Sequence, residues 1–299
     1  MESLRYLEEY LERFHSFNFD KFINLYRGLY SDDSNLEDKI EFSTLINQID
    51  EFNLRFGMFK LYNPKTIASF LKKTDYEISN LERILSFAQE FVPEMALGFD
   101  FNKNNSRVKI YLLRLPDNPS FNSDTINKIN DFLMINSINP IDLNNEEQEL
   151  KKCYILGIDF YHTANPSVKI YIRDENVDIS KTRNYLANKG TDSKFLHYFS
   201  ILESNGILKD TTVSNRYSNN NNKSNGVSAF FEVADNSNNI IEEMMGACFP
   251  ERINGFKEMI NTLEVDKPVR YSHVGLTFSE KYGQESLCVY YSPVIEVQK

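Results

Sequence analysis

Residues 97–114, LGFDFNKNNSRVKIYLLR, recur with the same pattern as residues 156–173, LGIDFYHTANPSVKIYIR. Each copy has two segments of alternating apolar and polar residues around a polar turn, which is the pattern of a β-hairpin. Helical periodicity separates the copies, because Ile126, Ile129 and Leu133 fall on one face of a helix. The repeating unit is therefore a hairpin and a helical segment, and this internal repeat decides the fold.

Three weaker copies of the hairpin bring the total to five, and they begin near Glu41, Lys209 and Val269. Helical periodicity runs between them, as over residues 80–91 and 193–206. The polar tract 219–226 is typical of a long hairpin loop, since strand-like patterns resume on both sides of it. We find no domain boundary and predict a single domain over residues 1–299.

Composition and charge exclude several classes of partner. The net charge of -10 argues against non-specific binding to nucleic acid or anionic lipid. No apolar run approaches the roughly 20 residues that span a membrane, and the N-terminal pattern is acidic and amphipathic, unlike a signal peptide. The three cysteines and four histidines lack metal-ligand spacing. We expect a cytoplasmic monomer with no nucleic-acid or membrane partner.

The alternation within each strand separates two faces. In the first copy, Phe99 and Val108 share one face, whereas Asp100, Lys109 and Tyr111 share the other. The polar face of the second copy holds the equivalent residues Asp159, Lys169 and Tyr171. Amphipathic helices would cover the apolar face, and the polar face would look inward if the strands close on themselves. The alternative is an open sheet whose polar face meets solvent.

The fivefold pattern favours closure. We therefore predict an α+β fold, a closed ten-stranded antiparallel barrel of five α-β-β-α repeats, with an outer ring of helices and a solvent-filled lumen. A lumen lined with charged residues and tyrosines cannot be a dry core without many unsatisfied charges, so it should hold water and a ligand.

Basic residues at corresponding strand positions indicate an anionic ligand. Lys109 and Lys169 are equivalent in the two clear copies, and Arg55 has a similar place in the first hairpin. Three cations that converge in a cavity suit a phosphate or a diphosphate. Alternatively, each cation pairs with a lumen aspartate, such as Asp100 or Asp159.

Tyrosines accompany these cations on the inward face. An aromatic face attracts a desolvated cation by about 1 to 2 kcal/mol, and a ring of such faces would shelter a carbocation from water. The combination fits ionisation of an allylic diphosphate and capture of the cation by an electron-rich acceptor, although each tyrosine alone is more often a half-buried strand residue. The candidates are Tyr111, Tyr171, Tyr217 and Tyr290, with Tyr161 as a further one.

The acceptor must lose a proton, so a base is required. Glu41 has the parity of Ser43 and would project inward beside Arg55, where a carboxylate is suited to take a proton. A salt-bridged Glu41 at the barrel mouth explains the spacing equally well.

These motifs resemble the ABBA aromatic prenyltransferases, and among them the cyanobactin-type peptide prenyltransferases. The resemblance rests on IEFS at 40–43, LRFGMF at 54–59, the GFDF and GIDFY hairpins, and the two VKIY strands. It spans nearly the whole chain through short motifs. The last hairpin also looks like the C-terminus of the soluble phenol and naphthol prenyltransferases.

The resemblance implies a role for each matching residue. Glu41 would be the base that contacts the acceptor. Arg55, Lys109 and Lys169 would hold the diphosphate. The tyrosine shield around the prenyl group would include Tyr111, Tyr171 and Tyr290.

Two departures from the family pattern bear on the diphosphate site. Ser286 and Ser228 stand where small-molecule members place a lysine and an arginine. Arg216 or Lys281 would compensate, or the diphosphate would lean on Mg2+ held mainly through the diphosphate itself. Asp100 and Asp159 are weak candidates for metal ligands.

We therefore expect a prenyltransferase that moves a dimethylallyl group from its diphosphate to a tyrosine, tryptophan or hydroxyl side chain of a ribosomal, macrocyclic peptide. The first alternative is prenylation of a free phenol or indole metabolite. The alternative from another class is a non-catalytic barrel that binds a phosphorylated or aromatic ligand.

Overall fold

The computed structural model describes most of the chain, and the described segments include the ten strands of the barrel. The described residues are 40–46, 53–58, 64–72, 81–91, 94–102, 107–113, 123–140, 153–161, 166–174, 179–188, 196–218, 226–235, 237–263, 268–279 and 284–293.

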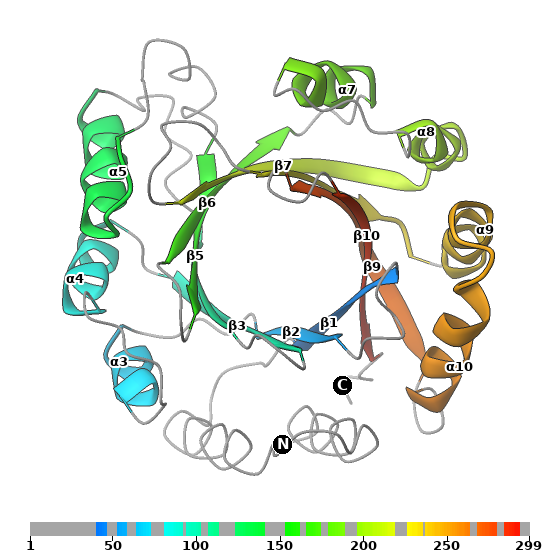
Figure 1. Cartoon of the computed structure of the whole chain (residues 1–299), viewed down its shortest axis with the longest axis horizontal. Coiled ribbons are helices and arrows are strands. Elements are labelled where there is room, and N and C mark those ends of the chain that lie inside the picture. The colour runs from blue at the N-terminus through cyan, green and yellow to red at the C-terminus, as the bar shows by residue number, and fades with distance from the viewer. Residues whose placement is uncertain are drawn as a thin grey trace, which may run out of the picture.

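Ten strands form a closed antiparallel barrel in the order β1-β10-β9-β8-β7-β6-β5-β4-β3-β2 (Figure 1). Each strand pairs with the next one in the chain, and β1 closes the ring by pairing with β10. The strands are β1 (Ile40–Leu45), β2 (Asn53–Met58), β3 (Glu94–Asn102), β4 (Arg107–Leu113), β5 (Cys153–Tyr161), β6 (Ser167–Asp174), β7 (Leu208–Ser218), β8 (Gly226–Val233), β9 (Val269–Ser279) and β10 (Gln284–Pro293).

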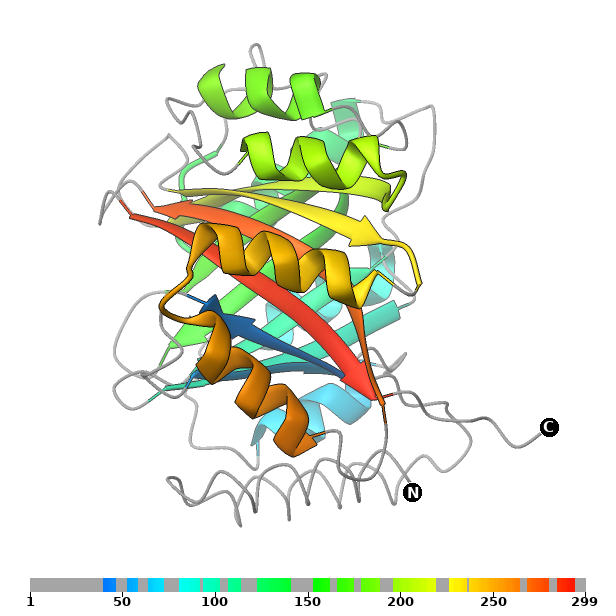
Figure 2. The same cartoon turned by 90° about the vertical axis from the view of Figure 1, so that its right-hand side faces the viewer.

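The described helices lie outside the barrel and cover its strands (Figures 1 and 2). They connect one hairpin to the next, as the repeat predicts. Their bounds are α3 (Pro64–Lys72), α4 (Leu81–Phe91), α5 (Ser123–Ile135), α7 (Ile179–Asn188), α8 (Leu196–Ser204), α9 (Asn238–Cys248) and α10 (Ile253–Leu263). None of these described helices is long and apolar enough to cross a membrane.

The helices form where the apolar periodicity places them. In α4 the buried side chains are Leu81, Ile84, Leu85 and Ala88, which form a single stripe. Helix α8 ends before Gly206, whose φ of 68° is in the left-handed region that glycine adopts without strain. The Gly206 amide donates to the Glu203 carbonyl, which closes the last turn.

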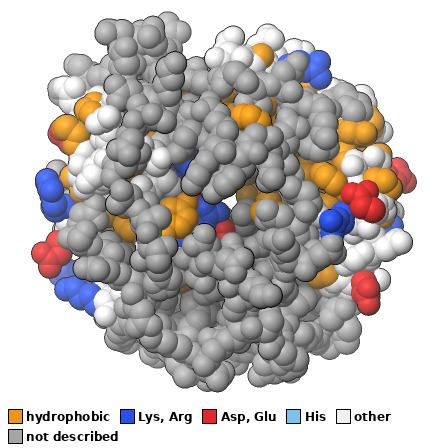
Figure 3. All heavy atoms as spheres, viewed as in Figure 1, with side chains coloured by type: hydrophobic (Ala, Val, Ile, Leu, Met, Phe, Trp, Pro, Cys, Tyr) orange, Lys and Arg blue, Asp and Glu red, His pale blue; other side chains and the backbone are white. Residues whose placement is uncertain are grey.

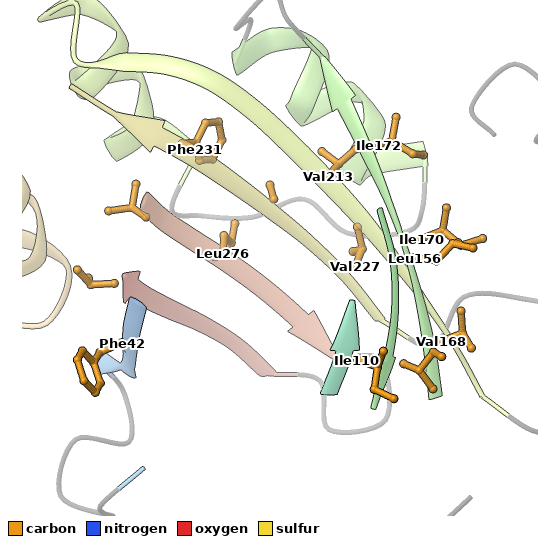
Figure 4. Packing of buried hydrophobic residues seen from close by; sticks show 14 of the residues in the cluster. Phe42, Ile110, Leu156, Val168, Ile170, Ile172, Val213, Val227, Phe231 and Leu276 are labelled. Atoms are coloured by element: carbon orange, nitrogen blue, oxygen red, sulfur yellow. The ribbon is translucent and has the colours of Figure 1, made fainter. Parts of the chain in front are cut away.

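The hydrophobic core is a layer between the barrel and the helices. It takes one parity of residues from successive strands, including Phe42, Ile110, Val168 and Phe231 (Figure 4). Phe231 of β8, for example, stacks on Phe199 of α8 with ring centroids 4.5 Å apart. Full burial of such a side chain stabilises the fold by about 1.5 to 3 kcal/mol. The predicted division into an apolar outer face and a polar inner face is confirmed, as are the antiparallel sheet and its outer helices.

Candidate active site

The other parity of each strand faces the lumen. Lys109 lies between Gly98 and Asp159 in the strand register, and Lys169 lies between Gly157 and Arg216. The space-filling view along the barrel shows an opening at the centre, with basic and acidic side chains at its edge (Figure 3). Charged residues from β3 to β7 therefore share one side of the lumen.

Arg107 binds both aspartates of this charged group. Its Nε donates to Asp100 Oδ2 at 2.7 Å, and its Nη1 donates to Asp159 Oδ2 at 2.8 Å. Burial alone would lower the pKa of Arg107, but the two carboxylates outweigh it and raise that pKa well above its usual value. Arg107 thus stays charged and joins two hairpins. The sequence analysis missed it, although it has the inward parity of Lys109.

The two aspartates brace the hairpins through ion pairs with basic side chains. Both carboxylates accept hydrogen bonds from Arg107, and Lys109 Nζ lies 3.9 Å from Asp100 Oδ2. A divalent cation there would have to displace positive side chains. Among the described residues, no three His, Cys, Asp or Glu side chains are grouped as metal ligands. Asp100 and Asp159 therefore do not fit the metal-ligand role that was considered for them.

The predicted cations Lys109, Lys169 and Arg216 do come together. Arg216 Nη2 lies 3.9 Å from Asp159 Oδ2, but within the described part of the chain no carboxylate is at ion-pair distance from the Lys169 ammonium. Lys169 is buried. Burial first, and then the charge of Arg216, lower the pKa of Lys169 well below its usual value. A bound anion would relieve this excess of positive charge. We call these three residues and Arg107 the cation cluster.

Arg55 lies in β2, and its backbone pairs with Ser43 on one side and with Asp100 on the other. This register gives it the lumen-facing parity that the sequence predicts. Its side chain, and the whole of Lys281, lie outside the described residues, so their part in the diphosphate site stays a prediction.

An aromatic belt continues around the lumen from the cation cluster. The ring centroids of successive members are 6.2, 6.0, 5.9 and 6.1 Å apart. The belt consists, in order, of Tyr111 (β4), Tyr171 (β6), Phe230 (β8), Tyr290 (β10) and His273 (β9). Burial and the neighbouring Tyr111 raise the pKa of Tyr171 well above its usual value, so its phenol stays protonated. The sequence analysis named the three tyrosines and missed Phe230 and His273.

Glycines make room for the belt. A Cβ atom on Gly98 would lie 3.0 Å from Tyr111, and one on Gly157 would lie 3.0 Å from Tyr171. A Cβ on Gly275 would come within 2.9 Å of Phe230. Each ring therefore lies against bare backbone of a neighbouring strand. This contact explains why the glycine recurs in the repeated hairpin.

The predicted effect of filling one such position is a loss of stability. Gly157→Ala should lower the free energy of unfolding by about 1 to 3 kcal/mol, because the Tyr171 ring packed against this position must shift to make room for the methyl group. The control is Gly255→Ala in α10, where a Cβ meets no atom within 4 Å and should stabilise the helix by up to about 1 kcal/mol. Chemical denaturation measures both. Equal effects of the two substitutions would contradict the packing role of Gly157.

Tyr217 does not belong to the belt, and its assignment to the shield is wrong. It pairs in register with Val168 and is 1% exposed within the helix-facing core. Because side chains alternate, the inward Arg216 places Tyr217 outward. Tyr161 does face the lumen, where its hydroxyl accepts a hydrogen bond from Arg107 Nη1 at 3.2 Å. It adjoins the cation cluster.

Glu41 lies next to the His273 end of the belt. Its Oε1 accepts a hydrogen bond from Ser272 Oγ and lies 3.3 Å from His273 Nδ1. The side chain is 10% exposed. The predicted base is thus a buried carboxylate held by strand β9, within the same lumen as the cation cluster.

No protein-family model matches the chain, and no curated protein does. Solved structures do match. One is 5-dimethylallyltryptophan synthase from Streptomyces coelicolor, with 11% identity, a TM-score of 0.65, and coverage of 87% of this chain and 82% of that one. Another is 6-dimethylallyltryptophan synthase from Micromonospora olivasterospora in complex with DMASPP and Trp, with 15% identity, a TM-score of 0.60, and coverage of 85% and 81%.

A third match is NotF in complex with brevianamide F and DMSPP, with 15% identity, a TM-score of 0.59, and coverage of 87% of this chain and 80% of that one. NotF is described as a prenyltransferase. At these identities the likeness concerns the fold. The chain has the fold of the ABBA aromatic prenyltransferases.

Proposed function

We propose that this protein transfers an isoprenyl group from its diphosphate to an aromatic acceptor. The observation that carries the proposal is the joint presence, in one lumen, of a cation cluster with excess positive charge and an aromatic belt. The five hairpins are, in this view, five copies of one α-β-β-α unit around a solvent-filled lumen. A binding barrel needs an anion site but has no need of a cation-stabilising belt beside a buried carboxylate.

The cation cluster receives the leaving group. Breaking the carbon–oxygen bond of an allylic diphosphate sends the electron pair to the diphosphate oxygen and leaves an allylic cation. Lys169 and Arg216 offer N–H donors to that oxygen, and the negative charge that develops there favours the ammonium form of Lys169. Such groups preorganised where charge develops stabilise the transition state. Arg107 holds the cluster together through its two aspartates.

The aromatic belt shelters the cation, and Glu41 takes the proton. The faces of Tyr111, Tyr171 and Tyr290 attract positive charge and keep water from it. The acceptor carbon or heteroatom attacks the cation and forms the new bond. Its proton then passes to the Glu41 carboxylate, which completes the substitution.

We propose a dimethylallyl donor and a side chain of a ribosomal, macrocyclic peptide as acceptor, on the strength of the cyanobactin-type motifs. A free indole or phenol is the second candidate, and the two solved structures with bound tryptophan and brevianamide F favour it. Mg2+ would be held through the diphosphate, since the described carboxylates do not fit a protein-built metal site.

Diphosphate release tests the function. Purified protein is incubated with dimethylallyl or geranyl diphosphate, with and without Mg2+, and with macrocyclic and linear tyrosine or tryptophan peptides, free tryptophan and phenols. Release of diphosphate, with a product heavier by one isoprenyl group, supports the proposal. Folded protein that releases none with any pair would overturn it, and the acceptor that reacts fastest decides between peptide and metabolite.

Lys169→Met should weaken donor binding and leave the fold intact. Loss of one charged hydrogen bond to the diphosphate predicts roughly 10- to 100-fold weaker binding. The unliganded protein should be equally or more stable, because the buried ammonium lacks a partner carboxylate in the described residues. Calorimetric titration with a non-hydrolysable donor analogue measures the affinity. Lys257→Met on helix α10, whose side chain is 48% exposed, is the control, and equal affinities would contradict the assignment of Lys169.

A further inference from the structure

Strand β9 departs from regular pairing beside the candidate base. Tyr290 lies opposite His273 and Tyr291 lies opposite Tyr271, so Ser272 is the extra residue of a β-bulge. In a regular strand, Ser272 and His273 would point to opposite faces. Here both side chains reach the same atom, Oε1 of Glu41. The bulge therefore gives one carboxylate oxygen two polar neighbours from consecutive residues.

His273 is the more exposed partner of the buried Glu41 carboxylate. The Glu41 side chain is 10% exposed, whereas that of His273 is 35% exposed. Among the described residues, the groups beside the imidazole include Glu41 from β1, Tyr290 from β10 with ring centroids 6.1 Å apart, and Glu232, its cross-strand neighbour on β8. Tyr290 packs edge-on against the ring. A titratable group that is more accessible to water than Glu41 thus contacts the lumen carboxylate.

We propose that His273 is the proton exit of this site, which takes the proton that Glu41 receives from the acceptor and passes it to solvent. The proposal rests on the proposed prenyl transfer. It assigns to Ser272 a positioning role, because its hydroxyl donates to the Glu41 carboxylate and keeps one carboxylate oxygen beside the imidazole.

The proton balance shows why an exit is needed. Each transfer forms a bond between the prenyl carbon and the acceptor, breaks the carbon–oxygen bond of the donor, and moves one proton to Glu41. Glu41 must lose that proton before it can act again. After a half-turn of the carboxyl group, the neutral imidazole accepts the proton at Nδ1. The imidazolium then releases a proton from Nε2 to water.

Replacement of His273 should slow turnover and leave substrate binding unchanged. For His273→Ala we expect kcat to fall roughly 10- to 100-fold, at the lower end of the range for proton-transfer groups, with KM for both substrates unchanged. Added imidazole should restore much of the rate. In the wild type, kcat should rise with pH as the imidazole becomes neutral and able to accept a proton.

Two matched variants separate proton transfer from structure. His273→Asn keeps an N–H donor near the position of Nδ1 but cannot take up a proton, so this rise with pH should disappear. Ser272→Ala loosens Glu41 but keeps the imidazole, so its slower rate should not respond to added imidazole and its pH profile should keep the rise. A wild-type rate and profile in His273→Asn would overturn the proposal, as would a loss in His273→Ala that imidazole fails to restore.

A measurement without substrates keeps this result distinct from the proposed function. The His273 ring is titrated by NMR in the wild type and in Glu41→Gln. Its titration should shift to lower pH in the variant, because a neighbouring negative charge favours the imidazolium. A shift in a protein that transfers no prenyl group would overturn the proposed function and uphold the coupling. An unmoved titration would overturn the coupling, whatever the activity.

Discussion

Replacing Asp159 by asparagine is expected to lower the free energy of unfolding by about 3 to 5 kcal/mol, the usual cost of removing one partner from a buried ionic network. The Asp159 side chain is 2% exposed. It accepts from Arg107 at 2.8 Å and lies 3.9 Å from Arg216. Without its charge, the cluster keeps four cations and only Asp100 among the described residues. Urea denaturation at about pH 7 measures the loss.

The loss of stability in Asp159→Asn should become smaller as the pH falls. Burial acts to raise the pKa of Asp159, but the charges of Arg107, Lys169, Lys109 and Arg216 outweigh it and hold that pKa well below its usual range. A carboxyl group with a lowered pKa stabilises the fold above its unfolded pKa of about 3.9 and loses this contribution as the pH falls toward the folded value. The difference between wild type and variant should therefore shrink below about pH 4.

A surface aspartate provides the control for Asp159. Asp235 is 63% exposed and pairs with Arg270 at 3.3 Å. Asp235→Asn should change the free energy of unfolding by less than about 1 kcal/mol. If Asp159→Asn were as mild as this control, the cation cluster would not depend on its central carboxylate.

Glu41→Gln is expected to reduce kcat by about 100- to 10,000-fold, the usual range for a group that moves a proton in the transition state. Glutamine keeps the shape of the side chain and its hydrogen bond from Ser272, but cannot take a proton. The cation cluster is untouched, so affinity for the donor should not change. Single-turnover kinetics and a separate titration with a donor analogue measure the two quantities.

A glutamate on an outer helix is the matched control for Glu41. Glu242 of α9 accepts a hydrogen bond from Tyr271 at 3.0 Å and pairs with Lys257 at 3.3 Å, on the outer side of the barrel. Glu242→Gln should leave kcat unchanged. Wild-type turnover in Glu41→Gln would remove the carboxylate from the mechanism and favour a barrel that only binds its ligand.

The inward-facing set of the repeated hairpins could be predicted because alternation is a local property. The alternation that places Lys109 and Tyr111 inward also places Arg107 inward. Arg107 was missed because it adjoins the polar turn and resembles a turn residue. Phe230 was missed for a different reason. Its strand is predicted correctly, but Phe230 stands among other apolar residues. The sequence therefore does not show whether Phe230 faces the lumen or the helices, and only the pairing register of the strand does.

Local alternation also explains why the assignment of Tyr217 to the tyrosine shield is wrong. Arg216 and Tyr217 are consecutive residues of a regular strand, so both cannot face the lumen. A bulge would have allowed it, and β9 contains such a bulge at Ser272. Nothing in the sequence around Ser272 and His273 distinguishes the bulged strand from the regular one.

The surroundings of Glu41 could not be predicted from any local pattern. Its hydrogen-bond partner Ser272 is 231 residues away in the chain. The contact exists because β1 and β9 both flank β10 in the closed barrel. The alternation along β1 predicts that the Glu41 side chain points inward. Its contacts with β9 follow only from the closed barrel.

The glycines under the aromatic belt let the rings of neighbouring strands lie close to the backbone of the lumen wall. Gly98, Gly157 and Gly275 lie on β3, β5 and β9, while the rings that cover them come from the even-numbered strands. The width of the lumen along the belt is therefore set by the size of these rings, because the backbone beneath them carries no side chain. A different side chain in place of one ring would reshape the lumen and leave the helix-covered core on the other face alone. The cross-section of the lumen can thus vary while the strand pairing and the helix-covered core stay the same.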